Sequence, residues 1–337
     1  MKTLFDTTSI GSFSLKNRFI RSATWEGMAD SSGHLTNRLV NVYDELSRGG
    51  IGLIITSATV ITPEATTIPG ILGIYDNSFI PEYQSLTRLC HQNSVPVVMQ
   101  LTHVGDHGAM WTPQDPSHEQ IKRLVKSFGD AAYRAQQSGF DGVQLHAGHG
   151  YFISQFLHPR KNTRTDEYGG SVENRTRLIL EISSEIRSRV GNDFGIFIKI
   201  NCSDFQEEDD GVFEACKYAC LELATQGIQG IEITGGAGGF PKPPAVMYSE
   251  SVFRDYAAQI AEMISVPVIL VGMNRSPSVM ADILNTTRIE YFSLSRPLIR
   301  QPDLVNVWRD DPDAGSECTS CDACRQPDGN VCPFRTG

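Results

Sequence analysis

The feature that most constrains this chain is a regular alternation of short apolar runs and amphipathic segments. Eight apolar runs have the length and composition of buried strands: residues 19–23, 51–59, 95–101, 142–146, 194–200, 230–234, 266–271 and 291–294. Segments with helical periodicity follow them: residues 37–48, 80–93, 119–138, 171–190, 212–225, 251–264, 277–285 and 303–309. Because parallel strands are joined by crossover helices, this order predicts an α/β protein with a parallel sheet.

The number of strand–helix units decides between two α/β architectures. Eight units favour a closed (β/α)8 TIM barrel, and a length of 337 residues suits one such barrel with insertions. The rival is an open, doubly wound sheet, but no G-x-G-x-x-G follows the first strand. We therefore predict a TIM barrel over residues 1–310 and a short cysteine-containing C-terminal tail over residues 311–337.

Composition and charge limit the classes of binding partner and the cellular compartment that the sequence predicts. A net charge of −10 argues against nucleic acid or an anionic membrane surface as the main partner. No run of about eighteen apolar residues predicts a membrane span, and the N-terminus lacks the apolar stretch of a secretory signal. Eight cysteines without such a signal indicate a reducing compartment, so we expect a cytoplasmic protein. The sequence is compatible with a homo-oligomer and does not fix the oligomeric state.

The end of the fourth predicted strand carries the most distinctive polar residues. His146, His149 and Tyr151 come at the C-terminal end of this strand, which is where TIM barrels place their active sites. The two imidazoles could bind a metal, polarise a carbonyl oxygen or serve as structural polar groups at the rim. No carboxylate lies close to them in sequence, which disfavours a two-His-one-carboxylate metal site. The neighbouring phenol of Tyr151 favours proton transfer.

Other strand ends supply residues suited to a ring system and a phosphate. Gln100 offers a donor and an acceptor, which suits a ring with amide-like edges. Lys199 could form a Schiff base or act as a fixed positive charge. Gly272 and the Ser295–Arg296 pair follow the seventh and eighth strands, where barrels often bind phosphate. The alternative for these last residues is a turn glycine and a surface arginine.

Five stretches carry a resemblance to a known family. They are LKNRFIRSA at residues 15–23, QLTHVG at 100–105, DGVQLHAGHGYFISQFL at 141–157, TDEYGGSVENR at 165–175 and SRPLIRQPDL at 295–304. The chain resembles the Old Yellow Enzyme family of flavin-dependent ene-reductases over roughly residues 1–310. Within that family it is most similar to the barrel portion of 2,4-dienoyl-CoA reductases and related NADH:flavin oxidoreductases.

This resemblance implies a cofactor, a reaction and a set of residues. It implies an FMN-dependent enzyme in which NADH or NADPH reduces the flavin. The flavin N5 then gives hydride to the C=C bond of an α,β-unsaturated carbonyl compound, either an enone or an enoyl or dienoyl thioester. The implied FMN contacts are Ala23, Thr24, Ala58, Gln100, His146, Lys199, Gly272, Ser295 and Arg296. The implied catalytic residues are His146 and His149, which bind the substrate's carbonyl oxygen, and Tyr151, which donates the proton.

The tail holds four cysteines in the pattern C-x2-C-x2-C-x7-C, at Cys318, Cys321, Cys324 and Cys332. Four thiolates suit an iron–sulfur cluster or a structural zinc ion, and the alternative is a tail of reduced thiols that binds nothing. Long relatives carry a four-iron cluster in the corresponding region. Two other functions therefore compete with the ene-reductase. One is a flavoprotein electron-transfer subunit that uses the cluster without reducing an enone, and the other is a lyase that forms a Schiff base at Lys199.

Overall fold

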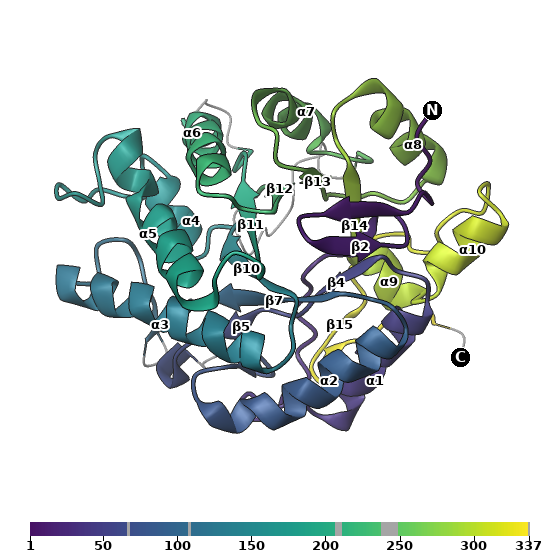
Figure 1. Ribbon diagram of the computed structural model, residues 1–337, viewed down its shortest axis with the longest axis horizontal. Coiled ribbons are helices and arrows are strands. Elements are labelled where there is room, and N and C mark those ends of the chain that lie inside the picture. The colour runs from purple at the N-terminus through teal and green to yellow at the C-terminus, as the bar shows by residue number, and fades with distance from the viewer. Residues whose placement is uncertain (66–67, 107–108, 206–210, 237–248, 336–337) are drawn as a thin grey trace.

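The computed structural model describes residues 1–65, 68–106, 109–205, 211–236 and 249–335. Eight parallel strands form a closed ring in the order β10–β11–β12–β13–β14–β3–β4–β7, and β10 also pairs with β7 (Figure 1). The bounds of the ring strands are β3 Phe19–Arg21, β4 Leu53–Ile55, β7 Val97–Thr102, β10 Gly142–Ala147, β11 Gly195–Asn201, β12 Gly230–Thr234, β13 Val268–Leu270 and β14 Tyr291–Leu294. The predicted (β/α)8 barrel is confirmed.

Helices surround this ring (Figure 1). They are α1 Asn37–Arg48, α2 Ile80–Gln92, α3 His118–Gln137, α5 Val172–Val190, α6 Val212–Thr225, α7 Arg254–Met263, α8 Pro277–Thr286, α9 Arg296–Arg300 and α10 Leu304–Asp310. A short additional helix, α4 Phe152–Leu157, lies in the connection that follows β10. The long helices begin at side-chain caps. Ser117 forms a capping box with Gln120 at the start of α3, and the Ser171 hydroxyl accepts the Asn174 N–H at the start of α5.

The second predicted strand, residues 51–59, is interrupted in the structure. It divides into β4 and a two-residue strand, β5 Thr59–Val60. Between them the Ser57 N–H donates to the Tyr43 hydroxyl at 2.8 Å instead of to a neighbouring strand. After this interruption β5 continues along the end of β7, the strand that β4 also pairs with, and it pairs on its other side with β6 Leu72–Gly73.

The hydrophobic core has two layers. Inside the barrel, residues such as Ile20, Leu53 and Phe197 pack against a hairpin formed by β1 Thr8–Ile10 and β2 Phe13–Leu15. This hairpin covers the starts of β11 and β12, because a Cβ on Gly195 would meet Phe13 at 2.4 Å. A larger layer lies between the strands and the helices. Since the N-terminal end of the barrel is covered, the C-terminal end is available for a site.

Smaller elements complete the loops and the tail. The connection after β5 contains η1 Pro63–Ala65 and η2 Asn77–Phe79, and β8 Gly105–Asp106 pairs with β9 Ala109–Met110. The tail folds into a hairpin of β15 Arg325–Gln326 and β16 Gly329–Asn330.

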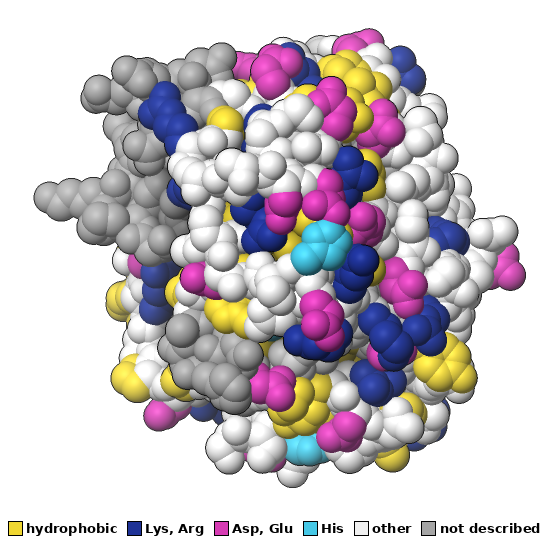
Figure 2. Space-filling model, turned by 90° about the vertical axis from the view of Figure 1, so that its left-hand side faces the viewer, with side chains coloured by type: hydrophobic (Ala, Val, Ile, Leu, Met, Phe, Trp, Pro, Cys, Tyr) yellow, Lys and Arg dark blue, Asp and Glu magenta, His cyan; other side chains and the backbone are white. Residues whose placement is uncertain are grey.

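The helices and one face of the surface can be described in terms of hydropathy and charge. No helix among the described residues is both long enough and apolar enough to cross a lipid bilayer. On the face that carries α3 and α5, Lys and Arg side chains are interspersed with Asp and Glu (Figure 2). Charges of both signs are thus mixed on the described part of this face (Figure 2).

Candidate active site at the C-terminal end of the barrel

Strand register brings the predicted polar residues together. His146 on β10 is paired with Lys199 on β11, and Gln144 is paired with Gln100 on β7. Two positions further along β11, Asn201 is paired with Thr234 on β12. All of these side chains are buried at the same end of the ring. Residues separated by up to 134 positions in sequence therefore form one polar cluster at the carboxyl ends of the strands.

His146, His149 and Tyr151 lie against one another, as the sequence predicts. The His146 ring centroid is 5.3 Å from that of His149 and 5.4 Å from that of Tyr151. His149 Nε2 lies 2.9 Å from the Thr234 hydroxyl. The Tyr151 ring packs against an apolar cluster around Val60 and Val104. These contacts hold the two imidazoles and the half-buried phenol next to one another at the carboxyl end of β10.

The backbone of His149 has an unusual conformation that the site stabilises. Its φ is 61°, in the left-handed region that non-glycine residues seldom adopt. Its N–H donates to Asn201 Oδ1 at 2.7 Å, and Asn201 Nδ2 donates to Asp204 Oδ1 at 2.7 Å. Asp204 is itself bound by Lys161 at 2.9 Å. A buried hydrogen-bonded chain therefore fixes the position of the His149 ring.

Both imidazoles are neutral at physiological pH. Burial, with a smaller contribution from Lys199, lowers the pKa of His149 to about 3. Burial also lowers the pKa of His146 well below its ordinary value, and the neighbouring His149 and Lys199 lower it further. A neutral imidazole has one N–H donor and one acceptor nitrogen. The pair can therefore donate hydrogen bonds to a substrate oxygen without introducing a second buried charge.

Glu232 lies at the centre of the cluster, and the sequence predictions missed it. Its carboxylate accepts hydrogen bonds from Ser22 at 2.7 Å, Ser293 at 2.6 Å and Gln144 at 2.8 Å. Lys199 Nζ lies 3.5 Å away. Burial alone raises the pKa of Glu232, but Lys199 and these hydrogen bonds lower it below its ordinary value. A lone acid inside the apolar run GIEIT at residues 230–234 was the available signal.

This network assigns roles to Lys199 and Gln100. Lys199 Nζ donates to the Ser22 hydroxyl at 2.7 Å and pairs with Glu232, so it is held as a fixed cation. This arrangement disfavours the Schiff-base lyase, which needs a free amine. Gln100 Nε2 donates to Gln144 Oε1 at 2.7 Å, and Gln144 donates in turn to Glu232.

The ends of β13 and β14 form the predicted phosphate-binding region. Gly272 has a φ of 105° and is followed by Met273 with a φ of 61°. Thr24 Oγ1 lies 2.8 Å from Ser295 Oγ. Ala23 follows β3 and Ala58 follows β4, and both are half-buried. Arg296 Nη2 contacts the Met273 sulfur at 2.8 Å, and Nη1 contacts Asp322 of the tail at 2.7 Å. A thioether is a weak acceptor, so this edge of the guanidinium is suited to a better one.

The four tail cysteines line one cavity of about 300 Å³, together with Arg296 and Arg300 of α9. All four are reduced. Among the described side chains, no three of these sulfur atoms lie within 4.8 Å of one another. A tetrahedral zinc ion with Zn–S bonds of about 2.3 Å would bring its sulfur ligands to roughly 3.8 Å apart. The described positions of these sulfur atoms therefore do not form a closed zinc site.

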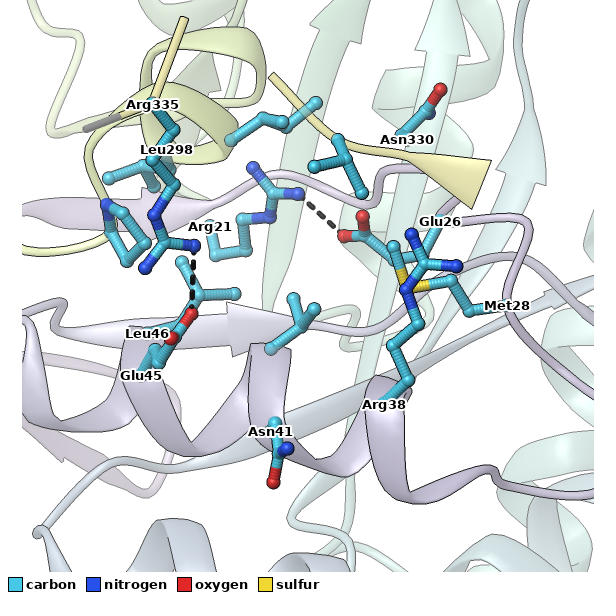
Figure 3. A pocket seen from close by; sticks show the side chains of 14 residues that line it. Arg21, Glu26, Met28, Arg38, Asn41, Glu45, Leu46, Leu298, Asn330 and Arg335 are labelled. Atoms are coloured by element: carbon cyan, nitrogen blue, oxygen red, sulfur yellow. Dashed lines mark hydrogen bonds and ion pairs between the residues drawn. The ribbon is translucent and has the colours of Figure 1, made fainter. Parts of the chain in front are cut away.

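A second cavity, of about 200 Å³, lies beneath the tail between α1 and α9. The buried ion pair of Arg21 and Glu26 lines it, with Nη2 and Oε1 2.6 Å apart (Figure 3). At its edge Arg335 of the tail pairs with Glu45 of α1 at 3.0 Å. Asn330 donates its backbone N–H to the Glu26 carbonyl at 2.7 Å. These contacts attach the tail to the segment that follows β3 and carries Trp25.

Comparison with known sequences agrees with this geometry. The profile of the NADH:flavin oxidoreductase / NADH oxidase family matches residues 3–116 and 107–310. This chain belongs to that family. Among its relatives, a metal reductase from Desulforamulus reducens is 30% identical over 342 residues, covering 95% of this chain and 51% of the relative. A cinnamate reductase from Clostridium sporogenes is 28% identical over 368 residues, covering 95% of this chain and 55% of the relative. The chain thus spans about half the length of these relatives.

Solved structures of family members have the same fold. A 2-naphthoyl-CoA reductase in complex with 2-naphthoyl-CoA has a TM-score of 0.83 at 23% identity, covering 93% of this chain and 53% of that one. Morphinone reductase has a TM-score of 0.78 at 25% identity, covering 94% of this chain and 92% of that one. The second comparison pairs almost the whole of both chains.

The residues at the barrel end fit the FMN that this family name implies. Gln100 and Lys199 are a buried amide and a buried cation at this end of the barrel, which is a donor set that could hold the polar edge of a flavin ring. At the opposite side, Gly272 and Met273 turn through positive φ, and the Arg296 guanidinium contacts only a thioether along one edge. FMN has oxygen acceptors on its ring and on its phosphate, and these acceptors match the donors at this end of the barrel.

Proposed function

We propose that this chain is an FMN-dependent NAD(P)H oxidoreductase that reduces the C=C bond of an α,β-unsaturated carbonyl compound. The observation that carries the proposal is the cluster of His146, His149 and Tyr151 beside Lys199 and Gln100 at the open end of the barrel. Enones, cinnamate-like acids and acyl-CoA thioesters are the substrate classes to test. The names of the cinnamate, morphinone and 2-naphthoyl-CoA reductases among similar proteins support this choice.

FMN, once bound, supplies hydride for the β-carbon of the substrate after reduction by NADH or NADPH. Gln100 and Lys199 hold the polar edge of its ring, with Ala23, Thr24 and Ala58 along it. Gly272, Ser295 and Arg296 hold its phosphate. The Lys199 ammonium favours negative charge on the ring, and the buried Glu232 carboxylate at 3.5 Å moderates that effect.

The two histidines bind and polarise the substrate. Because both imidazoles are neutral, each can donate one N–H to the carbonyl oxygen and stabilise the negative charge that develops there. The contact between His149 Nε2 and the Thr234 hydroxyl can form with either tautomer of the neutral imidazole, and substrate binding selects the tautomer. The Asn201–Asp204 chain keeps His149 in place, so these donors need no reorganisation during the reaction.

Tyr151 completes the reaction as the proton donor. Its phenol O–H transfers a proton to the substrate's α-carbon as hydride reaches the β-carbon, which gives a saturated carbonyl product. The half-buried position of Tyr151 allows solvent to return the proton between turnovers. The apolar cluster against its ring holds the hydroxyl in a fixed direction.

A direct test titrates the apoprotein with FMN and then assays enone-dependent NAD(P)H oxidation. We expect stoichiometric FMN binding, weakened in Lys199→Met and Arg296→Gln, and turnover with at least one of the three substrate classes. Failure of the apoprotein to take up FMN would contradict the proposal. The exposed Lys126→Met serves as the matched control for charge loss, because Lys126 lies on the outer face of α3.

A specific observation also favours a second role. The four tail cysteines line one cavity, and four thiolates are a usual ligand set for an iron–sulfur cluster. We propose that they hold an iron–sulfur cluster that exchanges electrons with the flavin or with a partner. Iron and acid-labile sulfide analysis after anaerobic reconstitution tests this, and a protein that binds no iron would contradict it.

A further inference from the structure

The hairpin of the tail is bound to the segment that follows β3. Asn330 of β16 donates its backbone N–H to the Glu26 carbonyl at 2.7 Å, and its side-chain amide donates to the Trp25 carbonyl. Gly329 of the same strand packs so closely that a Cβ there would meet the Glu26 carbonyl oxygen at 2.7 Å. Two hydrogen bonds and close backbone packing therefore hold residues 25–26 from the side of the tail.

The side chain of Glu26 extends this contact to the strands of the barrel. Its carboxylate accepts a hydrogen bond from Arg21 Nη2 at 2.6 Å (Figure 3). Arg21 Nη1 donates in turn to the Ser295 carbonyl at 2.5 Å. Both members of the ion pair are buried, so a shift of either one leaves a buried charge without its partner, which is costly. The position of Glu26 is thus linked to that of Ser295.

The far end of this chain of contacts lies among the residues proposed to contact FMN. The Ser295 hydroxyl oxygen is 2.8 Å from the Thr24 hydroxyl oxygen. Thr24 directly precedes Trp25, whose carbonyl is bound by Asn330. One short segment is therefore held at Thr24 by the end of β14 and at residues 25–26 by the tail.

We infer that Asn330 is a positioning residue of the flavin site. It fixes the backbone at Glu26, and the ion pair of Glu26 with Arg21 carries that position to Ser295. This inference rests on the FMN site proposed above. Groups that are already ordered before a ligand arrives bind it more tightly, because their ordering costs nothing on binding. The tail hairpin therefore raises the affinity for FMN through the order that it imposes on residues 24–26.

The test titrates FMN into the apoprotein of the full chain and compares dissociation constants. Asn330→Ala removes the amide that binds the Trp25 carbonyl and should weaken FMN binding by about threefold to tenfold, the equivalent of one net hydrogen bond. Asn330→Asp keeps the size of the side chain but has no donor, so it should weaken binding at least as much. Amide hydrogen exchange of residues 22–28 in the apoprotein should be faster in both variants.

The same hairpin supplies the matched control. The exposed Gln326 of β15 donates its side-chain amide to the Ala323 carbonyl within the tail. Gln326→Ala removes an amide from the hairpin as Asn330→Ala does, but it leaves the bonds to residues 25–26 in place. It should change neither the FMN dissociation constant nor the hydrogen exchange of residues 22–28.

A double-mutant cycle tests the path through the ion pair. Glu26→Gln keeps an acceptor for Arg21 but loses the charge, and it should weaken FMN binding by itself. In that background Asn330→Ala should have a smaller effect than in wild type, because both changes act on one chain of contacts. Additive effects on the FMN dissociation constant would overturn the transmission from Asn330 to Ser295.

The remaining failures are separable. A wild-type chain that takes up no FMN would overturn the proposed function and this inference together. Equal FMN dissociation constants in wild type, Asn330→Ala and Asn330→Asp would overturn the inference alone and leave the flavin site intact. Equal weakening in Gln326→Ala and Asn330→Ala would also overturn it, because the effect would then come from the hairpin in general and not from its bonds to residues 25–26.

Discussion

The end of the barrel and the cysteine cavity of the tail position their polar groups in different ways. At the barrel end, Glu232 and its partners lie on strands whose register fixes each side chain, and the carboxylate accepts three short hydrogen bonds. In the cysteine cavity, the lining comes mostly from loops, and Arg296 and Arg300 pair there with acidic residues of the tail that are exposed. Strand register therefore positions the first network, whereas surface ion pairs position the second.

This difference predicts that substitutions at the barrel end affect catalysis and folding. Substitutions in the cysteine cavity should affect only a group bound there. Changes among the strand residues should alter chemistry or stability strongly, because a rigid scaffold cannot reorganise around them. Changes in the tail should leave the barrel's stability nearly unaltered. Four predictions test this contrast, in order of decreasing effect.

The largest effect is expected for Tyr151→Phe. Removal of the phenol O–H should slow enone reduction by about 10²- to 10⁴-fold, the usual contribution of a positioned general acid. Flavin reduction by NAD(P)H should be retained, because that half of the reaction does not use the proton. Stopped-flow measurement of the two half-reactions checks both statements. Tyr133→Phe, at an exposed position on α3, is the control, and equal slowing in both variants would refute the assignment.

The next effect concerns the buried ion pair of Lys199 and Glu232. Glu232→Ala leaves the Lys199 ammonium buried without its counter-charge and should destabilise the apoprotein by about 3–5 kcal/mol. Urea unfolding measures this change. The double variant Lys199→Met/Glu232→Gln removes both charges and should recover part of the loss. An unfolding free energy of Glu232→Ala equal to that of wild type would show that the network does not stabilise the barrel.

A smaller effect is a pH dependence that originates at His149. In the unfolded chain this imidazole binds a proton below its ordinary pKa of 6.5, whereas in the folded protein its pKa is about 3. The unfolded state therefore binds more protons between these values, and stability falls as the pH falls through this window. His149→Gln should reduce the slope of the unfolding free energy against pH within this window by about 1.4 kcal/mol per pH unit.

A surface histidine supplies the control for this pH dependence. Asp141 raises the pKa of His91 through a hydrogen bond at 2.8 Å. His91 therefore contributes stability that is present at low pH and lost as the pH rises past its folded pKa. His91→Gln should change the slope of the unfolding free energy against pH in the direction opposite to His149→Gln. Changes of the same sign in both variants would contradict the conclusion that burial lowers the pKa of His149.

The smallest effect is expected in the tail. Asp322→Asn breaks an ion pair with Arg296 whose carboxylate is 50% exposed, so the unfolding free energy should change by less than about 1 kcal/mol. Thermal unfolding of the FMN-loaded protein measures it. A loss as large as that of Glu232→Ala would mean that the tail is an integral part of the barrel fold.

Much of the fold could be predicted because the barrel strands are buried on both faces. Continuous apolar runs such as residues 194–200 have few alternative structures, and the residues at their ends are then fixed by register. His146, His149 and Tyr151 were predictable because all three follow one strand within six residues. The interruption of the second strand was not, since it depends on a hydrogen bond between Ser57 and the distant Tyr43.

The missed residue has a physical explanation. Glu232 acquires its role from Ser22, Ser293 and Lys199, which lie 33 to 210 positions away in sequence, and no local pattern connects them. Sequence indicates what lies at a strand end, but the partners of a buried charge depend on the closed fold.

The most direct test of the account is an anaerobic stopped-flow experiment on the FMN-loaded chain. NADH or NADPH should bleach the yellow flavin absorbance, and mixing the reduced protein with enone, cinnamate or acyl-CoA thioester should restore it with formation of the saturated product. That recovery should be slow in Tyr151→Phe. Bleaching without recovery by any of the three oxidant classes would contradict an ene-reductase and favour a chain that only transfers electrons.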